Sequence, residues 1–212
     1  MTNFRLNLRK VAAIVACLAV IMFSGCKKDA DPTPVDKDGL TEDIHNIIPD
    51  EHIETLKELG LKINGGNMPP NIEGKYFAET LELVATNTPG GRVAQQWDMY
   101  VTFSGQNNET LTVNVDYTMQ TELEPLSANG SGSYIVGKGN KFTVFVDARR
   151  IYGGYTAKTV EFFSGEIITD GIKNYQWGII MIDNAGNPLG YWIGDGKSYV
   201  KKAGNGLATK VD

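Results

Sequence analysis

The feature that most constrains this chain is a long region, from about residue 76 to residue 202, in which apolar and polar residues alternate. In the cleanest segment, 111–119, every odd position is apolar and every even position is polar. A period of two predicts a half-buried β-strand with one wet face. Further strands are predicted at 76–86, 94–103, 132–137, 142–148, 156–168, 175–183, 188–193 and 197–202.

The connections between these segments are short and carry turn residues, as in Thr88-Pro89-Gly90-Gly91 and Asn184-Ala185-Gly186-Asn187. Parallel strands would need helical crossovers, and no helical pattern of that length intervenes. The sequence therefore predicts a mainly β fold, an antiparallel meander of about eight or nine strands. Closure into a barrel removes the sheet edges, and a two-sheet sandwich is the alternative.

Two of the predicted strands, 160–168 and 177–182, are apolar on both faces and need cover on their outer side. The only predicted helix of the mature chain spans 49–59 and is the available cover. Pro49 suits its first position and Gly60 its end. Its apolar face consists of Ile53, Leu56 and Leu59.

The N-terminus has the order of a secretory signal: Arg5, Arg9 and Lys10 precede an apolar run, 11–23, which small residues follow. The sequence Ser24-Gly25-Cys26 resembles the lipobox of bacterial lipoproteins. That resemblance implies that residues 1–25 are removed and that Cys26 is acylated. The alternatives are a plain signal peptide or one uncleaved membrane helix, although the run is shorter than the about 20 residues that a span needs.

These features divide the chain into five parts. They are a signal peptide (1–25), a flexible acidic and proline-containing tether from Cys26 (26–46), a helix and loop (47–74), an antiparallel β-barrel (75–203) and a C-terminal tail (204–212).

Charge and cysteine content exclude several functions. Removal of residues 1–25 takes away three basic residues and no acidic one, so the formal net charge changes from −5 to −8. An acidic chain is a poor partner for nucleic acid, which is bound mainly through Lys and Arg. The two cysteines are Cys17 and Cys26, so the region after Cys26 can form no disulfide and no thiolate metal site.

The segment Pro69-Pro70-Asn71-Ile72-Glu73-Gly74-Lys75-Tyr76 opens the first predicted strand with a Gly-x-aromatic pattern. This pattern resembles the start of lipocalin-like, calycin-type barrels. With the preceding Leu-Gly-Leu-Lys-Ile-Asn-Gly-Gly, residues 59–66, the layout resembles uncharacterised lipoproteins of the Bacteroidetes. The charged tract after Cys26 is similar to the export tag of their surface-exposed members. The resemblance implies a lipid-anchored protein of the cell envelope, in the outer membrane, and it brings no catalytic residue.

No catalytic group, metal site or cofactor is predicted. The only imidazoles after residue 26 are His45 and His52, outside the strand region, where a surface or capping role is favoured over metal binding. A hydrolase would need paired carboxylates, and Asp98 and Asp116 on adjacent strands are the one candidate pair.

Aromatic residues on the strands are the only candidates for a binding site. If the barrel holds a ligand, these side chains would line it together with a few polar groups, although they would equally form an ordinary core. The predicted function is a binding module for a small apolar or amphiphilic molecule. The alternative is an accessory envelope protein that docks on another protein through its outer face. The candidate ligand-binding residues are Trp97, Tyr117, Phe162, Trp177 and Trp192.

Overall fold

The computed structural model describes residues 32–211 except 90–94, 121–125, 153 and 189, so the signal segment and Cys26 lie outside the described residues. The described chain is mainly β with two helices, one more than predicted. None of its helices is long and apolar enough to cross a membrane. The elements are α2 (Glu42–Ile47), α3 (Asp50–Glu58), β1 (Asn67–Met68), β2 (Gly74–Thr86), β3 (Trp97–Asn107), β4 (Thr112–Gln120), β5 (Leu126–Lys138), β6 (Lys141–Tyr152), β7 (Tyr155–Ile168), β8 (Gly171–Asp183), β9 (Ser198–Ala203) and β10 (Leu207–Val211).

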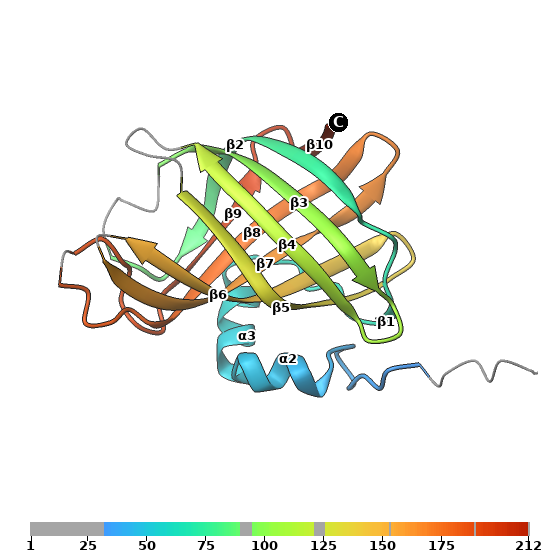
Figure 1. Cartoon of the computed structure of the whole chain (residues 1–212), viewed down its shortest axis with the longest axis horizontal. Helices are drawn as coiled ribbons and strands as arrows, with labels where there is room; N and C mark the ends of the chain where they lie inside the picture. Colours follow the sequence, from blue (N-terminus) through green and yellow to red (C-terminus); the bar gives the residue numbers. More distant parts are fainter. Residues whose placement is uncertain (1–31, 90–94, 121–125, 153, 189, 212) are drawn as a thin grey trace, which may run out of the picture. The chain divides into compact units, whose positions relative to one another are not determined.

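The strands form one sheet whose pairings return to their starting point, as Figure 1 shows. Each of β2 to β8 pairs antiparallel with the next, and β9 and β10 both connect β8 back to β2. The only parallel pairing between described strands is the short one of β1 with β5. The predicted mainly antiparallel β fold is confirmed, and its strands lie in one ring-like sheet rather than in two sheets.

The last two strands share one place in the ring. β10 pairs with the first half of β2 and of β8, whereas β9 pairs with their second halves. The structure therefore differs from the C-terminal tail predicted at 204–212. A strand was not predicted here because the segment 207–211 is too short to show a clear alternation. Its pairing with two long strands, β2 and β8, makes it a strand.

The segment 188–193, predicted as a strand, instead belongs to a long connection between β8 and β9. The side-chain amide of Asn187 donates to the carbonyl of Trp192, 2.7 Å away, and its oxygen accepts from the Trp192 N–H at 2.9 Å. These local bonds satisfy backbone groups that a strand would pair with a neighbour.

The sheet is buried on two faces. The cluster on its enclosed face takes side chains from every strand between β2 and β10. A second cluster lies outside β5–β9 and contains Phe145, Phe162 and Ile180 from the strands, with Ile53 and Leu56 from α3. The predicted cover of the two-faced strands by this helix is confirmed.

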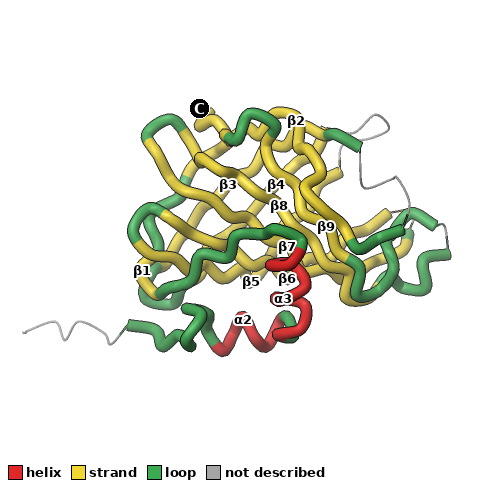
Figure 2. The backbone as a smooth tube through the Cα atoms, turned by 180° about the vertical axis from the view of Figure 1, so that it is seen from behind, coloured by secondary structure: helices red, strands yellow, loops and turns green. Residues whose placement is uncertain are grey.

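Residues 32–66, which we call the outer arm, run along the outside of the ring-like sheet, as both views show (Figures 1 and 2). Leu40 and Ile44 are buried in the outer cluster. Residues 32–46 therefore differ from the predicted flexible tether. The helix α2 was missed, although Thr41 accepts a hydrogen bond from the Ile44 N–H and two acidic residues follow it, which is a helix start signal.

The outer arm is fixed to the sheet by a close backbone crossing at glycines. The N–H of Gly66 donates to the carbonyl of Gly39, and the N–H of Gly137 on β5 donates to that of Gly66, both at 2.8 Å. A Cβ atom at Gly65 would overlap the carbonyl oxygen of Asp38. Only glycine allows this approach, which joins the arm to the edge of β5.

Candidate functional site

The enclosed face of the sheet differs between its two ends. We call the end that carries the β2–β3 and β8–β9 connections the long-loop end, and the opposite end, with the β3–β4 and β5–β6 turns, the short-hairpin end. Near the short-hairpin end, the Phe103 ring lies 6.0 Å from that of Tyr76, 6.2 Å from that of Phe142 and 5.8 Å from that of Phe163. Aromatic packing of this kind fills the interior there.

Toward the long-loop end, the enclosed face carries a buried carboxylate. Glu161 on β7 is fully buried, and its Oε1 accepts from Arg150 Nε and from the Tyr117 hydroxyl, each at 2.8 Å. Its Oε2 accepts from Trp177 Nε1 at 3.1 Å. A second guanidinium nitrogen of Arg150 donates to the Tyr117 hydroxyl at 2.8 Å. We call Tyr117, Arg150, Glu161 and Trp177 the Glu161 cluster.

The Glu161 cluster is electrostatically self-contained. Burial lowers the pKa of Arg150, but its interactions with Glu161, Tyr117 and Tyr199 together outweigh that effect and raise it, so the guanidinium stays charged. Burial raises the pKa of the Tyr117 hydroxyl well above its ordinary value, so this group stays a neutral donor. Removing such a pair from water is expensive, and its hydrogen bonds offset that cost only because every partner is present.

A second buried cation lies beside the cluster. Lys201 on β9 is paired in register with Trp177 on β8, so both side chains lie on the enclosed face. Its Nζ lies 4.3 Å from the centre of the Trp97 ring and donates to the carbonyl oxygen of Gln95. The side chain is fully buried, and among the described residues it forms no ion pair with a carboxylate. Burial lowers the pKa of Lys201 to about 8.

Three of the five predicted ligand-binding residues meet on the enclosed face. Tyr117 and Trp177 belong to the Glu161 cluster, with ring centres 6.4 Å apart, and Trp97 lies under Lys201. Phe162 is a correction, because its side chain points outward and contacts Phe145 under the outer arm. Since β7 is apolar on both faces, hydrophobicity alone could not tell the two faces apart.

Trp192, the fifth predicted residue, lies in the β8–β9 connection rather than on a strand, and it is half-buried. Its backbone is held by the side chain of Asn187. The next residue, Ile193, packs against the inner cluster at the long-loop end.

Sequence reasoning missed the three charged residues that distinguish this end. Glu161 had a visible signal, since a carboxylate inside the apolar run Val160-Glu161-Phe162-Phe163 must be buried and paired. Arg150 and Lys201 each stand beside another basic residue, Arg149 and Lys202, which are exposed. A pair of neighbouring basic residues on a strand points to both faces, so one of each pair had to turn inward.

The candidate carboxylate pair for a hydrolase does not meet. In the register of β3 and β4, Asp98 lies opposite Gln120 and Asp116 lies opposite Thr102. Asp98 instead accepts a hydrogen bond from the Thr80 N–H at 2.8 Å. This bond stabilises the irregularity in the pairing of β2 with β3 between Ala78 and Leu81.

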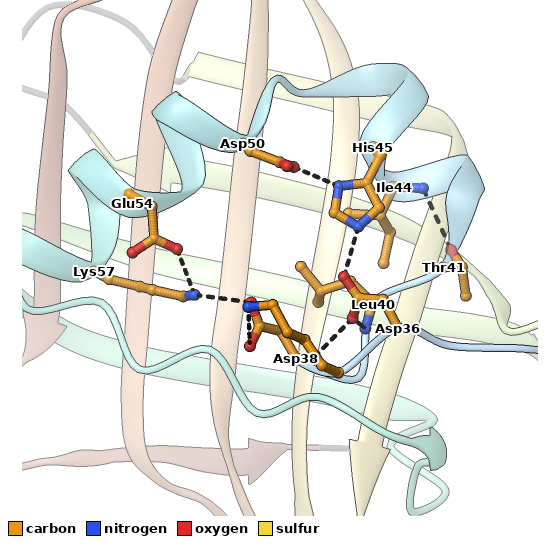
Figure 3. A network of polar contacts seen from close by, with 10 residues as sticks. Asp36, Asp38, Leu40, Thr41, Ile44, His45, Asp50, Glu54 and Lys57 are labelled. Atoms are coloured by element: carbon orange, nitrogen blue, oxygen red, sulfur yellow. Dashed lines mark hydrogen bonds and ion pairs between the residues drawn. The ribbon is translucent and has the colours of Figure 1, made fainter.

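A polar network on the outer arm holds its two helices together (Figure 3). The His45 ring contacts Asp50 at the start of α3 through Nδ1, at 2.6 Å, and Asp36 through Nε2, at 3.0 Å. Burial lowers the pKa of His45, but the hydrogen bonds to Asp36 and Asp50 and the charges of these carboxylates together outweigh that effect and raise it. The imidazole therefore serves as a clamp on the surface of the arm.

Among the described residues, no group of His, Cys, Asp and Glu side chains has the arrangement of a metal site. Comparison of the chain with protein families, curated proteins and solved structures found no match.

Proposed function

We propose that this chain is a lipid-anchored binding module of the cell envelope, in the outer membrane, with a lipocalin-like barrel that takes up a small apolar or amphiphilic molecule at its long-loop end. The observation that carries the proposal is the uneven interior. Near the short-hairpin end the interior holds uncharged aromatic side chains, whereas the aromatic side chains toward the other end lie beside Arg150, Glu161 and Lys201. A closed core needs no charge, because replacing buried ion pairs by apolar groups is often neutral or stabilising.

The apolar side chains around this region support access from outside. Leu83, Trp97 and Ile193 pack against the inner cluster at the long-loop end and are only partly buried. Binding sites typically combine such apolar walls with a few convergent polar groups. The Glu161 cluster and Lys201 supply those polar groups here.

The first test is native mass spectrometry with lipid extraction on residues 26–212 carrying Cys26→Ser, which removes the acylation site. We expect a co-purifying small molecule that is lost from Trp97→Ala. The matched control is Tyr100→Ala, because Tyr100 lies on the outer face of the same strand. A mass equal to that of the bare chain, unchanged after exposure to fatty acids and neutral lipids, would refute ligand binding.

The lipid anchor is tested separately. The full chain, expressed in a bacterium that processes lipoproteins, should incorporate labelled palmitate and fractionate with membranes. Cys26→Ser should abolish both. Labelling of the Cys26→Ser variant would place the acyl group elsewhere and contradict this part of the proposal.

The alternative function, docking on an envelope protein, is favoured by one observation. Ile151 and Tyr155, on the two sides of the β6–β7 turn, are exposed by 69% and 41%. On the two strands that are apolar on both faces, the outward side chains of Phe162 and Ile180 are covered by the outer arm and are not available for docking. This alternative is tested by a pull-down from envelope extracts with the chain and with its Ile151→Ser/Tyr155→Ser variant. We expect a partner that the variant loses. A partner that the variant retains would show that this hairpin is not the docking site.

A further inference from the structure

The charges on the enclosed face do not balance among the described residues. Arg150 and Glu161 neutralise each other through a 2.8 Å contact. Lys201 adds a positive charge for which the described residues provide only a carbonyl oxygen and an aromatic ring. An ammonium group hydrates strongly and has three donors, so burying it with such partners is unfavourable unless an anion completes the site.

The neighbours of Lys201 indicate that the ligand has an apolar part as well as an anionic group. Across the strand pair, Lys201 lies opposite Leu83 of β2 on one side and Trp177 of β8 on the other. Leu83 and Trp97 are apolar and partly exposed at the long-loop end. A molecule that reaches Nζ from this end passes between apolar side chains, which favours an apolar chain attached to the anionic group.

We propose that Lys201 binds the anionic group, a carboxylate or a phosphate monoester, of an amphiphilic ligand whose apolar part contacts Leu83, Trp97 and Ile193. This inference rests on the proposed binding function and specifies its ligand class. The Glu161 cluster acts as a positioning element, because it holds Trp177 beside Lys201 and leaves Arg150 engaged with Glu161 rather than with the ligand.

Anion binding by Lys201 should depend on pH, because only the protonated side chain is charged. Because burial lowers the pKa of Lys201 to about 8, the side chain is charged at pH 7 and loses its charge in moderately alkaline solution. The groups that face it are the Trp97 ring, the Gln95 carbonyl and, across the strand pair, Trp177, none of which titrates in this range. Tyr199, two residues away on the same face, has a pKa raised by burial to about 12 and stays neutral.

The experiment uses residues 26–212 with Cys26→Ser, stripped of lipid and titrated at pH 7 with palmitate, dodecyl phosphate and the uncharged 1-hexadecanol. Lys201→Met keeps most of the length and the apolar volume of the side chain and removes its charge. Lys202→Met is the matched control, because Lys202 is the next residue and is exposed. Isothermal titration calorimetry measures binding, and thermal unfolding of each unliganded variant is measured in parallel.

We expect palmitate or dodecyl phosphate to bind the unsubstituted chain and its Lys202→Met variant alike, and Lys201→Met at least about ten-fold more weakly, as for the loss of one charge-assisted contact. Affinity for the anionic probe should fall between pH 7 and pH 10, whereas that of Lys201→Met should not. Unliganded Lys201→Met should have an unchanged or higher Tm, since a desolvated charge is removed. Tighter binding of palmitate would identify the anionic group as a carboxylate, and tighter binding of dodecyl phosphate would identify it as a phosphate monoester.

Three results would overturn the inference. Equal affinity of the anionic probe for the unsubstituted chain and Lys201→Met would show that Lys201 does not contact it. A Tm of Lys201→Met that falls by many degrees would show that Lys201 is paired within the chain. Binding of 1-hexadecanol but of neither anionic probe would also refute the role of Lys201, while leaving the proposed binding function intact.

Discussion

At the scale of single residues, the fold tolerates the charges of Arg150 and Glu161 inside the ring because these two groups have a defined set of partners. Glu161 accepts four hydrogen bonds, from Tyr117, Arg150, Thr159 and Trp177. Those donors come from four different strands, so the carboxylate connects β4, β6, β7 and β8 at one point. A group in that position contributes to the choice of strand register as well as to stability.

Glu161→Gln should therefore lower the free energy of unfolding by about 3–5 kcal/mol, because it leaves Arg150 buried without a counter-charge. Urea denaturation followed by tryptophan fluorescence measures this change. The control Glu166→Gln, on the same strand, should change stability by less than about 0.5 kcal/mol, since Glu166 is partly exposed and an amide can still accept from Asn140. Equal stability of Glu161→Gln and the unsubstituted chain would show that Arg150 finds another partner.

At the scale of elements, we expect the stability of the outer arm to depend on pH. Its apolar contacts bury Ile44, Ile48, Ile53 and Leu56 against the sheet. The polar clamp of His45 with Asp36 and Asp50 adds a smaller contribution, because these groups are partly exposed to solvent.

Since the folded-state pKa of His45 is raised, its protonated ring stabilises the arm fully below pH 6.5, the ordinary value, and loses this contribution as the pH rises through the folded-state pKa. We expect a loss of up to about 1 kcal/mol between pH 6 and pH 8. Hydrogen exchange of α2 and α3 amides, corrected for the intrinsic pH effect, measures it. His45→Gln should remove the dependence and His52→Gln should keep it; the same pH dependence in His45→Gln would assign it to another group.

At the scale of the whole molecule, the packed outer arm shortens the segment that could act as a tether. Five residues, 27–31, lie between Cys26 and the described chain, and the chain from Cys26 to Pro32 reaches at most about 20 Å when extended. Thr33 and Asn67 fix the beginning of the arm near Glu109, in the β3–β4 turn. If Cys26 carries the proposed lipid, this length limit leads us to expect the short-hairpin end closer to the membrane than the long-loop end.

This orientation is testable because the chain has no cysteine after Cys26. We expect a fluorophore on Glu109→Cys to be quenched by headgroup-labelled lipids in proteoliposomes, and one on Tyr155→Cys to be quenched much less. A flexible insertion of about 20 residues after Asp31 should abolish the difference, since a Gly/Ser linker of that length spans about 25 Å on average. Equal quenching at both positions without the insertion would contradict the short tether.

The sequence by itself determined the β class, the antiparallel connections and the helix α3, because these follow from local periodicity and turn chemistry. It also indicated that the strands around Phe162 and Ile180 need cover on both faces. The tertiary structure alone decided which face encloses the interior, since a strand that is apolar on both sides has no sequence signal for its inner face. Long-range strand pairing also decided that Glu161 and Lys201 point inward while Phe162 and Lys202 point outward. The same kind of pairing, with β2 and β8, made Leu207–Val211 a strand that completes the ring.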